Sequence, residues 1–239
     1  LDTLETDKGA LLVNRTVEKS KPTVELMPEL VEKSLAALPI PKRMRWGAGK
    51  TEFVRPVHWL VQLYGNTVIE TPVMNLKPGN KTRGHRFHCP KELIVPTPAD
   101  YEVVLKQEGY VLADFAERRE QIRAGVNALA EKEANGKAVI DEDLLDEVTA
   151  LNEWPVPLMG RFEDRFLEVP AEALISSMKE HQKYFHVVDA SDNMLPLFIT
   201  VANLESKDPS QVISGNEKVI RPRLSDAAFF YETDRKTRL

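Results

Sequence analysis

The sequence predicts an α+β fold, in which an antiparallel, hairpin-rich sheet packs against helices. Two blocks of the chain contain paired β-branched and aromatic runs joined by turn-forming residues, and a block of helical periodicity separates them. The chain has 239 residues, of which 42% are hydrophobic. That length suffices for one large core or two modest ones. No period of 20 to 50 residues repeats, so the sequence does not support a solenoid.

The first part of the α+β core is expected over residues 1–96. Apolar residues at helical spacing predict a helix over 23–38, which Pro39 and Pro41 end. Strands are expected over 59–64 and 67–73. Gly65-Asn66 joins them, and this pair readily adopts the positive φ angles of a tight hairpin turn.

A helical insertion is expected over residues 97–151. Its first helix begins near Asp100 and stops at Gly109, and a long charged helix runs from Phe115 to Gly136. Asp141 is expected to be the N-cap of a third helix, because an apolar stripe and an acidic first turn follow it.

The second part of the core is expected over residues 152–214. A strand over 156–159 precedes a short helix that Pro170 opens. A hairpin with strands 184–188 and 195–201 follows, and a turn-forming cluster joins these strands.

Residues 215–239 are expected to be the start of a helix that leads into a further domain, and the neighbours Phe229 and Phe230 are expected to be core residues. The chain begins with Leu1, and this last helix lacks a stop signal. We therefore expect the sequence to be a piece of a longer protein.

Charge and cysteine content narrow the class of protein. The net charge of −5 argues against a protein that coats polyanions at random. The single cysteine, Cys89, cannot form an intrachain disulfide, which predicts a reducing, cytoplasmic setting. No apolar run approaches the ~20 residues of a bilayer-spanning helix, so we expect no membrane partner.

Basic residues nevertheless gather in windows. Residues 71–91 contain no acid but include Arg83, His85 and Arg86, with Gly84 to let backbone approach a ligand and Phe87 to stack on an unpaired base. The alternative reading is a solvated basic loop. Cations recur in three other places. Arg43 and Arg45 lie beside Trp46, segment 177–186 contains Lys179, His181 and Lys183, and Arg221 and Arg223 lie near the start of the last helix.

Other chemistries find weaker support. His85, His88 and Cys89 lack a fourth metal ligand nearby, and Ser176 and Ser177 near His181 lack the elbow of a serine hydrolase. Neither a complete GxxxxGK[ST] nor a GxGxxG motif occurs. We therefore expect no catalytic, metal or cofactor site in this chain.

Long strings of the sequence resemble the β subunit of the bacterial heterotetrameric glycine–tRNA ligase. They occur in the family's order and span nearly the whole chain. They include Met44-Arg45-Trp46-Gly47, Phe53-Val54-Arg55-Pro56-Val57-His58, Arg83-Gly84-His85-Arg86-Phe87, Asn152-Glu153-Trp154-Pro155-Val156, His181-Gln182-Lys183-Tyr184-Phe185, Val201-Ala202-Asn203-Leu204-Glu205 and Arg221-Pro222-Arg223-Leu224-Ser225-Asp226-Ala227.

The resemblance implies that an α subunit activates glycine with ATP and Mg²⁺, while the β subunit recognises glycine tRNA within an α2β2 assembly. It also implies a fold similar to the editing-type domain of the phenylalanine–tRNA ligase β subunit. The expected partners are therefore glycine tRNA and the α subunit, with no DNA.

Three functions are compatible with these residues. The first is a tRNA-binding and assembly module, whose expected tRNA contacts are Arg43, Arg45, Arg83, His85, Arg86, Lys179, His181, Lys183, Arg221 and Arg223. The second is hydrolytic editing of mischarged tRNA around His85 or His181. Glycine is the smallest amino acid, so steric exclusion leaves little need for editing. The third is a module that only docks the α subunit.

Overall fold

The computed structural model describes residues 2–7, 9–14, 16–17 and 19–236. These residues form two compact units. The first consists of the described residues up to 81 together with 96–98, and the second consists of 82–95 and 99–236.

The first unit contains a helix and short hairpins. In chain order its elements are β1 (Asp2–Thr6), β2 (Gly9–Val13), α1 (Thr23–Ala37), β3 (Met44–Arg45), β4 (Glu52–Phe53), β5 (Leu63–Tyr64) and β6 (Thr67–Val68). The strands pair antiparallel as β1 with β2, β3 with β4 and β5 with β6. Helix α1 confirms the predicted helix to within one residue.

The hairpin at Gly65-Asn66 is confirmed at its turn, but the expected strands are much too long. Gly65 has φ +56° and only two residue pairs form. Before the turn, the carbonyl of Gln62 still accepts the amide of Ile69 at 3.0 Å, but the amide of Gln62 donates at 3.1 Å to the carbonyl of Gly79, which lies outside the hairpin. Val73 closes a local turn with Leu76, and Pro72 before it has no N–H to donate.

The second unit contains the longer elements. They are β7 (Lys81–Arg83, which begins at the last residue before the second unit), β8 (Glu92–Ile94), η1 (Pro98–Asp100, whose first residue belongs to the first unit), α2 (Tyr101–Gln107), α3 (Phe115–Ala134), β9 (Lys137–Ala138), α4 (Glu142–Leu151), β10 (Val156–Arg161), η2 (Asp164–Glu168), α5 (Ala171–Gln182), β11 (Phe185–Val188), β12 (Met194–Ala202) and α6 (Pro209–Lys236). Within the described residues no helix combines the length and apolar content that crossing a bilayer requires.

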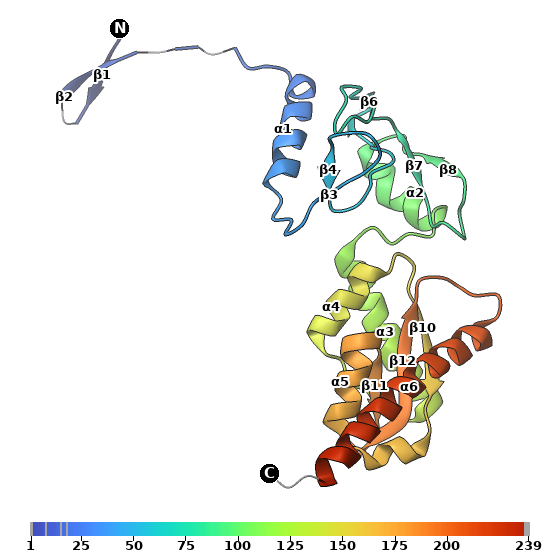
Figure 1. The fold of residues 1–239 in the computed structure, drawn as a ribbon. Coiled ribbons are helices and arrows are strands. Elements are labelled where there is room, and N and C mark those ends of the chain that lie inside the picture. Colours follow the sequence, from blue (N-terminus) through green and yellow to red (C-terminus); the bar gives the residue numbers. More distant parts are fainter. Residues whose placement is uncertain (1, 8, 15, 18, 237–239) are drawn as a thin grey trace. The chain divides into compact units, whose positions relative to one another are not determined.

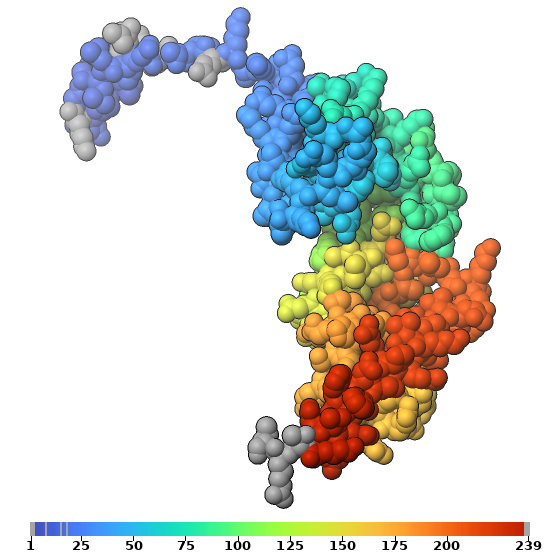
Figure 2. Space-filling model, in the orientation of Figure 1, coloured from blue at the N-terminus to red at the C-terminus, as the bar shows by residue number. Residues whose placement is uncertain are grey.

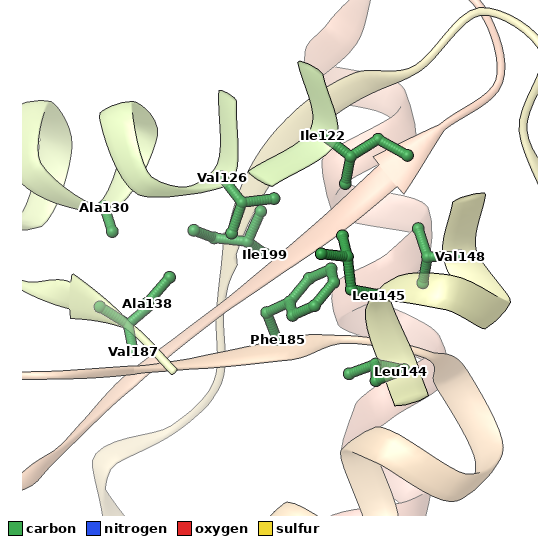
Figure 3. Packing of buried hydrophobic residues seen from close by; sticks show 10 residues of the cluster. All are labelled: Ile122, Val126, Ala130, Ala138, Leu144, Leu145, Val148, Phe185, Val187 and Ile199. Atoms are coloured by element: carbon green, nitrogen blue, oxygen red, sulfur yellow. The ribbon is translucent and has the colours of Figure 1, made fainter. Parts of the chain in front are cut away.

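An antiparallel sheet with the strand order β10-β12-β11-β9 forms the centre of this unit (Figure 1). On one face, residues of α3 and α4 pack against Phe185, Val187 and Ile199 (Figure 3). On the other face, residues of α5 and α6 pack around Tyr184 and Phe198. Neighbouring residues of a strand point to opposite faces. The adjacent residues Phe198 and Ile199 therefore belong to different hydrophobic cores, Phe198 to the one with α5 and α6 and Ile199 to the one with α3 and α4. Helices thus cover both faces of the sheet.

The predicted helical insertion is confirmed at one helix cap but differs from the structure in two respects: it contains a strand, and it does not have a core of its own. Asp141 caps α4 as expected, since its Oδ1 accepts the Leu144 amide at 2.9 Å. The segment is not all-helical, because Lys137 and Ala138 form β9 and pair with β11 at the edge of the sheet. Helices α3 and α4 also share a core with that sheet. The division of the chain at 96, 151 and 214 stays a prediction, as does the likeness to an editing-type domain.

The hairpin β11–β12 confirms the second predicted hairpin, with an irregular register between His186 and Val188. The last helix begins at Pro209, earlier than expected, and its predicted end lies outside the described residues. The expectation that Phe229 and Phe230 belong to the core is wrong, because they are 64% and 63% exposed. Ile220 and Leu224 fill the core from the opposite side of α6. Figure 2 shows α6, the red segment, at the surface of the second unit.

Candidate nucleic-acid interface

Residues 83–89, here called the 83–89 loop, follow β7 in the second unit and contain the most basic predicted motif. Gly84 lies against the chain at Gly109, where a Cβ atom would meet the Gly109 Cα at 2.6 Å. The His85 amide donates to the Gly109 carbonyl at 2.7 Å. Glycine at position 84 is therefore a steric requirement, and the loop is held closely against Gly109.

His85 is a structural residue within this loop. It is 3% exposed, and its Nε2 lies 2.6 Å from the carbonyl oxygen of Asn203. Its Nδ1 accepts the amides of Phe87 and His88 at 3.3 Å each. Since two N–H groups point at Nδ1, the ring proton belongs on Nε2 and is donated to Asn203. Both ring nitrogens are hydrogen-bonded within the protein, so His85 positions the loop, and its expected contact with tRNA stays a prediction.

A second set of hydrogen bonds ties the loop to residues after β12. The Glu205 amide donates to His88 Nε2 at 3.0 Å. Asn203 Oδ1 accepts the amides of Glu153 and Trp154 at 2.7 and 2.9 Å. The Trp154 indole donates to Glu205 Oε1 at 3.0 Å. Asn203 and Glu205 thus join the loop to the start of β10.

Aromatic rings strengthen the same junction. The His88 ring lies 5.0 Å from the Tyr110 ring, and Tyr110 meets Trp154 edge-on at 5.3 Å. Tyr110 adopts φ +54°, a left-handed conformation that an aromatic residue rarely takes. Such strain persists only where surrounding contacts hold it. The 83–89 loop is therefore a fixed surface.

The side chains that remain outside are suited to nucleic acid. Arg86 is exposed, and among the described residues no ion pair engages its guanidinium. Arg83 lies 3.8 Å from Glu92, with both side chains more than half exposed. Phe87 is 70% exposed. Guanidinium groups bind phosphate oxygens and an exposed ring stacks on a base, so this surface can bind a single or double strand.

The two expected contacts in the first unit take part in local structure. Arg43 Nη2 donates to the carbonyls of Leu35 and Ala36 at 3.3 and 3.0 Å, which caps the end of α1. Arg45 pairs with Glu52 at 3.0 Å across β3 and β4. Arg43 therefore has a clear structural task, and the charge of Arg45 is locally balanced.

The lysines of segment 177–186 are also balanced by acids. Lys179 Nζ lies 2.6 Å from Asp141 Oδ2, and Lys183 Nζ lies 2.9 Å from Glu147 Oε2. The hydrogen bond from Lys179, helped by the Leu144 amide, lowers the pKa of Asp141, while Asp141 raises the pKa of Lys179. These pairs hold α4 against the end of α5.

The remaining expected contacts lie elsewhere on the second unit. His181 is exposed near the end of α5, Arg221 pairs with Glu163 at 2.6 Å, and Arg223 is exposed on α6. In the described part of the chain no hydrogen bond or ion pair joins them to the 83–89 loop. The structure thus groups Arg83 and Arg86 and leaves the other cations apart.

The described residues contain no cluster of three or more histidine, cysteine or acidic side chains suited to a metal. His85 and His88 already have hydrogen-bond partners, and Cys89 is buried. The tripeptide Gly49-Lys50-Thr51 has the end of a phosphate-loop motif, but it leads into strand β4. It therefore lacks the helix N-terminus that such loops use.

Sequence reasoning missed the anchoring role of Asn203, Glu205, Tyr110 and Trp154. Asn203 and Glu205 fall inside one of the family-like strings, but nothing in their spacing indicates partners 50 and 117 residues away.

Residues 1–239 match the family model described as glycyl-tRNA synthetase beta subunit. The chain is 95% identical over 239 residues to the glycine–tRNA ligase beta subunit of Marinobacter nauticus, and 65% identical over 239 residues to that of Hahella chejuensis. It is 60% identical over 237 residues to that of Chromohalobacter salexigens. These matches cover 99 to 100% of this chain but 34% of each relative, so the chain spans about a third of their length.

Proposed function

The chain belongs to the glycyl-tRNA synthetase beta subunit family, and we propose that its second unit binds tRNA through the 83–89 loop. The relatives are named as subunits of a ligase that acts on glycine and tRNA. Within that reaction this chain supplies recognition of glycine tRNA. A partner α subunit activates glycine with ATP and Mg²⁺ in an α2β2 assembly in the cytoplasm.

The exposure of Arg86 and Phe87 on a fixed loop carries this proposal. Such a pair is typical of a nucleic-acid surface, since guanidinium groups hold phosphates and aromatic faces accept bases. The loop does not have to become ordered on binding, because His85 and His88 already anchor it. A preformed surface loses less entropy when it binds.

Salt dependence of binding tests the proposal. Glycine tRNA and an unrelated tRNA are titrated with the chain at several salt concentrations, for the wild type and for Arg83→Gln/Arg86→Gln. Each lost phosphate contact lowers the slope of log affinity against log salt by about 0.7 to 0.9, so the double variant is expected to lose about 1.4 to 1.8.

A matched control removes two other charges. Lys132→Gln/Lys137→Gln changes two exposed lysines at the end of α3 and on β9, with the same change in net charge. This control is expected to keep the wild-type slope. Equal slopes for the wild type and the Arg83/Arg86 variant would contradict the proposal.

A second function, docking of the partner subunit, is favoured by Phe229 and Phe230. Two neighbouring aromatic side chains that are nearly two-thirds exposed on α6 are typical of a protein contact. Phe229→Ser/Phe230→Ser is expected to reduce co-purification with the α subunit. The control Ile94→Ser/Leu151→Ser alters two side chains that are 60% and 62% exposed and should leave assembly intact. Unchanged assembly of the aromatic variant would rule out this contact.

Hydrolytic editing by His85 is not proposed. Both of its ring nitrogens are hydrogen-bonded inside the protein, so neither is available to activate water.

A further inference from the structure

A hollow of about 580 Å³ lies beside the exposed ring of Phe87. Its other walls come from His88 and from the segment after β12, namely Leu204, Glu205, Ser206 and Lys207. The hydrogen bond from the Glu205 amide to His88 Nε2 holds the two walls together. The hollow therefore exists before any ligand binds.

The walls of the hollow combine an aromatic ring, a cation and a carboxylate, and a hydrogen bond holds the carboxylate in place. Phe87 offers an apolar face, and Lys207 contributes an exposed cation at the other wall. The Glu205 carboxylate is oriented through its Oε1, which accepts the Trp154 indole N–H at 3.0 Å. Within the described part of the chain, no hydrogen bond is made to the other oxygen, Oε2.

This combination argues against several occupants. A free phosphate would use Lys207 but neither Phe87 nor Glu205, and a purely apolar ligand would use Phe87 alone. A base pair inside a duplex keeps its faces stacked on its neighbours and cannot lay one on Phe87. An unpaired nucleotide has a free base face, a phosphate and, in RNA, ribose hydroxyls that can donate to a carboxylate.

We propose that this hollow holds one unpaired ribonucleotide, with its base stacked on Phe87, its phosphate near Lys207 and a ribose hydroxyl donating to Glu205. The inference rests on the proposed function, because it specifies which part of an RNA reaches the 83–89 loop. Phosphate contacts cannot distinguish RNA from DNA, whereas Glu205 would favour ribose over deoxyribose at this position.

The test uses short single strands and the whole chain. Four-nucleotide RNA and DNA strands carrying the fluorescent base 2-aminopurine are titrated, and quenching of the base reports stacking. The wild type is expected to bind the RNA strand with quenching. Phe87→Leu should weaken binding about 5- to 150-fold, the usual effect of losing one stacked base, while Phe87→Tyr retains it.

The role of Glu205 is read from the ratio of the RNA and DNA affinities. A hydrogen bond to a charged group supports a preference of about tenfold or more, which Glu205→Ala should abolish. Phe115→Leu changes an aromatic residue that is 43% exposed at the start of α3, and it should behave as the wild type. Circular dichroism verifies that each variant is folded.

The outcomes separate the two proposals. If Arg83→Gln/Arg86→Gln loses tRNA binding while Phe87→Leu binds the RNA strand as tightly as the wild type, the nucleotide site is refuted and the tRNA surface stands. Absence of wild-type binding to the RNA strand at millimolar concentration also overturns the nucleotide site. A ribose preference that survives in Glu205→Ala refutes the role of that carboxylate.

Discussion

Replacement of Asn203 by alanine should destabilise the second unit, because one side-chain oxygen accepts two backbone amides. Those amides belong to Glu153 and Trp154, at 2.7 and 2.9 Å. An intramolecular hydrogen bond contributes about 0.5 to 1.5 kcal/mol, so the loss of both should lower the free energy of unfolding by about 1 to 3 kcal/mol. The main-chain carbonyl of Asn203 can still accept from His85.

Urea denaturation followed by far-UV circular dichroism measures this loss. Asn203→Asp retains an oxygen acceptor at the same position, so it should lose less than about 1 kcal/mol, within the range of one hydrogen bond. Asn127→Ala serves as the control, because Asn127 is exposed on α3, and surface changes of this kind stay within about 0.5 kcal/mol. The reasoning is refuted if Asn203→Ala unfolds at the wild-type urea concentration, or if the aspartate variant is as unstable as the alanine variant.

Three further changes test the packing and protonation of the second unit. Gly84→Ala should lower the free energy of unfolding by about 2 to 3 kcal/mol and weaken tRNA binding, because the Cβ of the new alanine would clash with the backbone of Gly109. Thermal unfolding and tRNA titration measure the two effects, and a wild-type melting temperature would contradict the clash. Burial raises the pKa of Tyr184 to about 12, so a spectrophotometric titration should show a phenol that ionises near pH 12 and is absent in Tyr184→Phe; the free energy of unfolding should fall between about pH 10, the ordinary pKa of tyrosine, and pH 12. Burial lowers the pKa of His186, so the folded state favours the neutral ring. The resulting stabilisation is present above about pH 6.5, the ordinary histidine pKa, and should be lost as the pH falls below that value. NMR titration of the ring measures the pKa, and an ordinary or raised pKa would refute this expectation.

Much of the fold follows from local sequence signals. The turn at Gly65, the cap at Asp141 and the hairpin around residues 190–193 depend on residues within a few positions of one another, and the structure contains all three. Strand β9 could not be predicted, since Lys137 and Ala138 are too few to show a period. Only their pairing with β11 makes them a strand.

The candidate site was predicted less completely, because distant partners decide the role of each cation. Lys179 is paired with Asp141, 38 residues away along the chain, and His85 is paired with Asn203, 118 residues away. A basic window predicts where charge gathers but not which charges remain free. For Phe229 and Phe230, adjacent positions on a long helix point in different directions, so the sequence cannot tell which face of α6 is covered.

A photochemical crosslink can show whether the 83–89 loop touches bound tRNA. A photoreactive benzoylphenylalanine replaces Phe87, which is 70% exposed, and in a parallel variant it replaces Phe115, which is 43% exposed. On irradiation with glycine tRNA, position 87 should crosslink to an unpaired nucleotide of the tRNA, and position 115 should give no crosslink. No crosslink from position 87, or equal yields from both positions, would contradict it.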